Sequence, residues 1–194
     1  MKTMKNKFNK PFAYYLGNFM MVAAVALLFF IYYPIVSIYL FPEGVELTEK
    51  VSDDFRIVIP KIYAEATVIE NVDPWNQDEY LEALQNGVAH ASGSALPGDA
   101  GTTYLFAHSS DVPWRITKYN TAFYRLGELD PGDEIYVERE GRRYRYIVKE
   151  KLEVWPNEVE YLKEDQGDVL ILQTCAPPGT ALKRLLIFAS PVLE

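Results

Sequence analysis

The pattern of hydrophobic and polar positions divides the chain into one uncharged stretch and a longer part in which apolar and polar residues alternate. From Leu16 to Leu40 there are 25 consecutive residues without a charge. About 20 helical residues, at a rise of roughly 1.5 Å each, cross the hydrocarbon core of a bilayer. The run therefore predicts a transmembrane helix over 16–40, and Pro34 is expected to kink or end it.

The flanks of this helix predict its orientation. Residues 1–40 contain no Asp or Glu, and the basic residues all precede the helix: Lys2, Lys5, Lys7 and Lys10. The positive-inside rule keeps such a tail, residues 1–15, in the cytoplasm. We therefore expect a single-pass protein of the cell membrane whose remaining part is extracellular. The alternatives are a cleaved signal peptide, although the run is long and no small-x-small site follows it, and a buried core helix.

Beyond a polar linker, residues 41–54, the pattern predicts one domain over 55–194 that is mainly β. Short alternating segments indicate strands, and Gly, Pro and Asp mark the turns. Asn76 and Glu79 predict the start of a helix that ends at Gly87. Loops are expected at 90–101 and 176–182, and a hairpin turn over 139–142. The expected strands are 55–62, 66–72, 102–108, 134–138, 143–149, 150–156, 168–175 and 183–190.

Composition narrows the function classes. The apolar fraction of 49% and the aromatic fraction of 14% exclude a disordered chain. Residues 41–194 carry 15 basic and 27 acidic side chains, a net charge of −12. Such an acidic domain argues against nucleic acid as a partner.

Candidate chemistry centres on the single cysteine. Cys175 ends an apolar strand, Arg184 lies on the next strand across a short loop, and His108 lies where another strand ends. An imidazole or guanidinium near a thiol favours the thiolate, and an imidazole can protonate a leaving amine. These residue types permit acyl transfer but leave open that Cys175 is a small buried hydrophobe. Other arginines, at 115, 125, 142 and 143, are rivals of Arg184.

Several segments together resemble the sortase family. The stretch LILQTC, 170–175, resembles the family's cysteine strand T-L-x-T-C, and KRLLIFA, which contains Arg184, resembles its arginine strand. AHSS contains His108 where the family usually has Gly-His. The segments 59–72, 87–108 and 129–158 follow in the family's order, so that the likeness covers roughly 55–190.

The resemblance implies an eight-stranded β-barrel and a cysteine transpeptidase. Cys175 would attack the C-terminal sorting signal, LPXTG-like, of a secreted protein and form a thioester, which an amine of the cell wall or a pilin would resolve. His108 would act as acid and base, and Arg184 would stabilise the oxyanion. Leu172, Thr174 and Ala107 would contact the substrate. The chemistry needs no metal or cofactor.

Departures from the family leave the subclass and the sorting motif open. Ala107 replaces the usual Gly, and Ala176 follows the cysteine. His90 also occurs in some members, where it lines the site or simply packs. Trp114 and Trp155 are expected to be packing residues. An L,D-transpeptidase is a weaker alternative, because Gln173 stands where that class has histidine, and a non-catalytic membrane-tethered β-domain for adhesion or assembly is another.

Overall fold

The computed structural model describes residues 12–40, 45, 47, 51–109, 122–163 and 166–192. The chain divides into two compact units, Met1–Phe41 and Pro42–Glu194.

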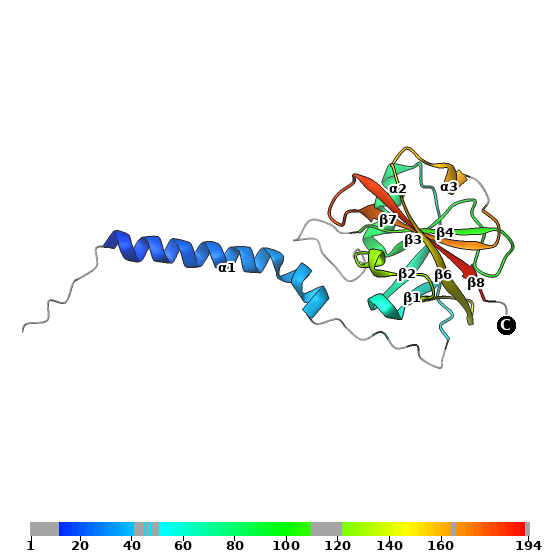
Figure 1. The fold of residues 1–194 in the computed structure, drawn as a ribbon, viewed down its shortest axis with the longest axis horizontal. Helices are drawn as coiled ribbons and strands as arrows, with labels where there is room; N and C mark the ends of the chain where they lie inside the picture. The colour runs from blue at the N-terminus through cyan, green and yellow to red at the C-terminus, as the bar shows by residue number, and fades with distance from the viewer. Residues whose placement is uncertain are drawn as a thin grey trace, which may run out of the picture. The chain divides into compact units, whose positions relative to one another are not determined.

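The first unit contains one helix, α1 (Phe12–Leu40), which begins four residues before the predicted start. Its apolar side chains are exposed around the helix, and the segment Phe12–Tyr33 has a mean hydropathy of 2.0 with none of it buried. A helix of this length and composition fits a single-pass membrane anchor. The helix does not end at Pro34 but continues to Leu40, and its axis turns near the C-terminal end (Figure 1).

In the second unit the described residues form eight strands that close into a barrel, as predicted (Figure 1). The strand order is β1-β2-β3-β4-β7-β8-β6-β5. The strands are β1 (Arg56–Ile59), β2 (Ala64–Val72), β3 (Val88–Ala91), β4 (Thr102–Phe106), β5 (Glu134–Arg139), β6 (Arg142–Val154), β7 (Val169–Ala176) and β8 (Lys183–Pro191).

The predicted hairpin joins β5 and β6 through a two-residue turn. Arg139 pairs with Arg142, and the turn residues Glu140 and Gly141 have φ values of 53° and 71°. Two positive φ values are the signature of a type I′ turn, whose twist matches that of the flanking strands. The two strands expected over 143–156 form one long strand, β6, with a register shift between Val148 and Glu150.

The helix α2 (Gln77–Asn86) begins where the sequence predicts. The side chain of Asn76 accepts a hydrogen bond from the Glu79 amide, which satisfies one free N–H of the first turn. The carboxylate of Glu79 accepts from the backbone amide of Asp73 rather than closing a complete capping box on Asn76.

Two local expectations are wrong. Pro60–Ile62 is a 3-10 turn rather than the end of a strand. The predicted loop 90–101 begins too early, because His90 lies within β3, which pairs with β2 and β4. A further short helix, α3 (Glu160–Lys163), precedes β7.

A buried carboxylate ties the end of the linker to the barrel. The Glu138 side chain on β5 is fully buried and accepts hydrogen bonds from Arg56 (2.7 Å), Arg143 (2.7 Å) and the Ser52 amide (2.9 Å). The amide of Glu140 also donates to the Asp53 carbonyl at 3.1 Å. Residues 52 and 53, at the end of the predicted linker, are therefore bonded to the β5–β6 hairpin.

Candidate active site

Two neighbouring strands, β7 and β8, bring the predicted cysteine and arginine together. In the antiparallel pair of β7 and β8, Cys175 lies directly opposite Arg184. Directly paired residues project on the same face of a sheet. The Arg184 Nη1 donates to the Cys175 Sγ at 3.5 Å, and the cysteine is partly exposed.

The predicted histidine follows β4, which pairs in parallel with β7. Phe106 pairs with Gln173, and the Ala107 amide donates to the Gln173 carbonyl at 3.1 Å. His108 comes two residues after this last pair and is partly exposed.

The face that carries Cys175 is the outer face of the barrel. Its paired residues include Ile171 on β7 and Phe188 on β8. The ring of Tyr161 from α3 packs edge-on against Phe188, with ring centroids 5.7 Å apart. Because a helix packs on the outside of such a barrel, this face is the outer one, and the partly exposed Cys175 lies on it.

The three predicted substrate contacts, Leu172, Thr174 and Ala107, are buried. Leu172 has no exposed surface and pairs with Leu105 and Ile187, which are also fully buried. The structure therefore places Leu172 in the core and away from the outer face. Thr174 is buried, and its hydroxyl donates to the Ala107 carbonyl at 3.0 Å. This bond holds the segment before His108 against β7.

Sequence reasoning missed Gln173 and Tyr104. Gln173 is partly exposed on the face of Cys175, and its Oε1 accepts a hydrogen bond of 2.6 Å from the Tyr104 hydroxyl. Alternation along β7 puts positions 173 and 175 on one face, so the sequence carried a signal for Gln173. The Tyr104 contact depends on pairing between distant strands and has no local signal.

The other candidates are engaged elsewhere. Arg125 pairs with Glu128, and Arg143 pairs with the buried Glu138. Trp155 is exposed, with the Lys183 ammonium 5.7 Å from its ring centroid. Arg142 is exposed at the far end of β6. Trp114, Ser110 and Arg115 lie outside the described residues.

His90 has a structural environment. Its Nδ1 accepts from the Asn71 amide at 3.3 Å, and its Nε2 lies 3.1 Å from the Ala95 carbonyl. The first bond leaves the proton on Nε2, which then donates to the carbonyl. Burial lowers the pKa of His90, although the Ala95 carbonyl opposes this effect. A buried, neutral and fully bonded imidazole packs within the fold.

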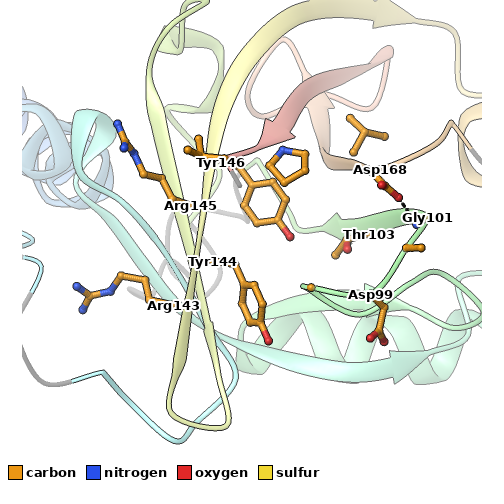
Figure 2. Close-up of a pocket in the computed structure, with 13 residues that line it drawn as sticks. Asp99, Gly101, Thr103, Arg143, Tyr144, Arg145, Tyr146 and Asp168 are labelled. Atoms are coloured by element: carbon orange, nitrogen blue, oxygen red, sulfur yellow. Dashed lines mark hydrogen bonds between the residues drawn. The ribbon is translucent and has the colours of Figure 1, made fainter. Parts of the chain in front are cut away.

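A pocket of about 480 Å³ lies at the opposite end of β7, beside Asp168 and Val169 (Figure 2). Figure 2 shows Arg143 and Arg145 extending away from the side on which Tyr144 and Tyr146 lie. None of the three predicted catalytic residues lines this pocket.

Comparison with known proteins agrees with this geometry. A family model described as the sortase domain matches residues 57–192. Sortase A from Corynebacterium diphtheriae is 26% identical, with a TM-score of 0.59 over 75% of this chain and 63% of that chain. The pilus-related sortase C of Group B Streptococcus is 25% identical, with a TM-score of 0.59 over 77% and 70%. A Clostridium perfringens sortase D5 transpeptidase, 21% identical with a TM-score of 0.58 over 75% and 84%, supports the fold alone. No curated protein matches the chain significantly.

The fold and the site together define a closed β-barrel enzyme with a cysteine and an arginine paired at one strand end. The chain belongs to the sortase family, whose members are cysteine transpeptidases. Its similarity to sortases A, C and D leaves the subclass open.

Proposed function

We propose that this sortase uses Cys175 to cleave the C-terminal sorting signal of secreted proteins and transfers the acyl group to an amine. The proposal rests on one observation above all: the Cys175 Sγ lies 3.5 Å from the Arg184 Nη1 on an accessible face. The guanidinium therefore lies beside the sulfur that attacks the substrate, where it can donate hydrogen bonds to the reacting groups.

In the first half-reaction the sulfur forms a bond to the scissile carbonyl carbon. The carbon–nitrogen bond breaks, and His108 gives its proton to the leaving amine, so that a thioester on Cys175 remains. Arg184 donates hydrogen bonds to the oxygen that becomes negative. In the second half-reaction an amine attacks the thioester, its proton passes to His108, and the thiolate leaves.

The Thr174 hydroxyl supports this arrangement. Its bond to the Ala107 carbonyl fixes the residue that precedes His108, so that the imidazole and the thiol keep their spacing. Small displacements of reacting groups are costly, because effective molarity depends on a near-attack geometry. We assign to Ala107 and Thr174 this positioning role.

The expected partners are secreted proteins that carry an LPXTG-like signal and an amine acceptor from the cell wall or a pilin. The helix α1 serves as the anchor, with residues 1–15 in the cytoplasm, residues 41–54 as the linker and the domain 55–194 outside the cell. Anchoring the enzyme where both tethered substrates meet raises their effective concentration. This transfer chemistry requires no metal or cofactor.

The test uses the full chain in lipid nanodiscs, incubated with LPXTG-type peptides and no amine. Intact-mass spectrometry should show the acyl fragment on Cys175, and addition of triglycine should release a transpeptidation product. The Cys175→Ala variant should show neither species while its melting temperature stays near that of the wild type. The proposal fails if the wild type cleaves no sorting-type peptide and a thiol-directed probe leaves Cys175 unmodified.

A further inference from the structure

The outer face of the barrel carries a polar pair close to the candidate nucleophile. On β7, Gln173 precedes Cys175 by two residues, and successive residues of one strand face lie about 6.6 Å apart. The Gln173 side chain is partly exposed, whereas its partner Tyr104 is 2% exposed. The pair therefore joins a buried hydroxyl to an amide that a ligand can reach.

The hydrogen bond between them fixes what the amide offers. The Tyr104 hydroxyl donates to the Gln173 Oε1 at 2.6 Å. Burial raises the pKa of Tyr104 far above its ordinary value, and the positive charge of Arg184 opposes this only in part. The phenol therefore stays protonated and remains a donor. With its oxygen occupied, the amide presents the two N–H donors of Nε2.

Those donors are not consumed by the fold. Within the described part of the chain the Tyr104 bond is the only hydrogen bond of the Gln173 side chain. A side-chain amide on a surface loses rotamer freedom when a ligand immobilises it, and this loss opposes binding. Tyr104 removes part of this freedom before any ligand arrives, which is preorganisation.

We infer that Gln173, oriented by Tyr104, is a specificity-determining residue that donates a hydrogen bond to a carbonyl of the bound peptide, two strand positions from Cys175. This inference rests on the proposed function and names a feature of its substrate. The acyl part of the peptide lies extended over the outer face and carries an acceptor at that point. Tyr104 acts through Gln173 and is a positioning residue.

The experiment compares full-chain variants in nanodiscs by the kinetics of peptide cleavage. Gln173→Met keeps the length of the side chain without its amide, and should lower kcat/KM about tenfold, mainly through KM. Tyr104→Phe should lower it about threefold to tenfold. The double variant should be no worse than Gln173→Met alone, because both changes remove one interaction.

Two controls separate this role from a general loss of structure. Tyr146→Phe removes the hydroxyl of another buried tyrosine, which lines the pocket at the opposite end of β7. It should lower the melting temperature and leave KM unchanged. Alkylation of Cys175 by iodoacetamide should proceed at the wild-type rate in Gln173→Met. A third test uses a set of peptides in each of which one carbonyl is reduced to a methylene. One of these peptides should be cleaved more slowly than the parent peptide by the wild type, but at the parent rate by Gln173→Met.

The outcomes are distinguishable. If the wild type forms acyl-enzyme and Gln173→Met changes kcat/KM less than twofold, the inference is overturned and the proposed function stands. Additive effects of the two substitutions, or no carbonyl that discriminates the variants, would also overturn it. If the wild type forms no acyl-enzyme with any sorting-type peptide, both proposals fall.

Discussion

Replacing Glu138 with Gln tests the reasoning about the buried ion cluster. The carboxylate is fully buried, whereas its partners Arg56 and Arg143 keep 22% and 23% of their side-chain surface. Removing one partner of a buried ion pair typically costs about 3–5 kcal/mol. We expect Glu138→Gln to cost an energy at the lower end of this range, because both arginines are partly exposed and Arg56 has a second ion pair with Glu65.

A loss of about 3 kcal/mol should lower the melting temperature by about 10 °C for a domain of this size. Glu153→Gln is the matched control, because its ion pair with Lys183 joins side chains that are 54% and 38% exposed. Such a surface pair contributes less than about 1 kcal/mol, so this variant should melt within about 3 °C of the wild type. Circular dichroism of the full chain in nanodiscs measures both.

The same substitution has a pH signature. Burial alone raises the pKa of Glu138, but hydrogen bonds from Arg56, the Ser52 amide and Arg143 outweigh it, so that the net pKa lies below its ordinary value of 4.5. Below pH 4.5 the unfolded chain binds the proton more readily, and the stabilisation is lost as the pH falls through the folded pKa. Glu138→Gln should therefore show a shallower fall in stability below pH 4.5. Equal slopes, or a melting temperature within 2 °C of the wild type, would refute the reasoning.

Three further predictions concern Arg184, the buried His90 and two loop glycines. Arg184→Ala should reduce kcat about 10²–10³-fold in peptide cleavage, whereas Lys183→Ala, one position away, should stay within about threefold, and equal losses would contradict the role of Arg184. Burial lowers the pKa of His90 from 6.5, so the folded state loses stability as the pH falls below 6.5; His90→Gln should flatten this dependence in melts, and an unchanged profile would count against it. Gly98→Ala should destabilise the folded domain by about 2–3 kcal/mol. Gly98 has a φ of +91°, and a Cβ added there would meet a tyrosine ring. Gly132→Ala, at φ +101° with open space, should cost about 1 kcal/mol, and similar denaturation midpoints for the two variants would refute the steric argument.

Local pattern predicts much of the fold because it acts over short distances along the chain. The apolar run predicts α1, alternation predicts most strands, and Glu140-Gly141 predicts the hairpin turn. The start of β3 is less clear locally, since Val88–Ala91 is short and lacks alternation. Its pairing with two distant strands decides its structure.

The residues of the candidate site also differ in how far they can be predicted from local sequence. Cys175 and Arg184 are close in sequence, and the loop between their antiparallel strands predicts their pairing. His108 is 67 residues from Cys175, and the parallel pairing of β4 with β7 joins their two strands. No periodicity reveals that pairing: the residue types alone made His108 a candidate, and the sortase resemblance gave it the role of acid and base. The burial of Glu138 is equally non-local, because its partners come from β1, β6 and the linker.

The position of β8 has a consequence for how the enzyme becomes active. This strand lies between β6 and β7, and it also carries Arg184. During synthesis it leaves the ribosome after the other seven strands, so barrel closure and delivery of the arginine are one event. A chain that lacks β8 would expose two strand edges and hold a cysteine without its cationic neighbour. If Arg184 acts as proposed, the enzyme gains its complete site only when the barrel is closed.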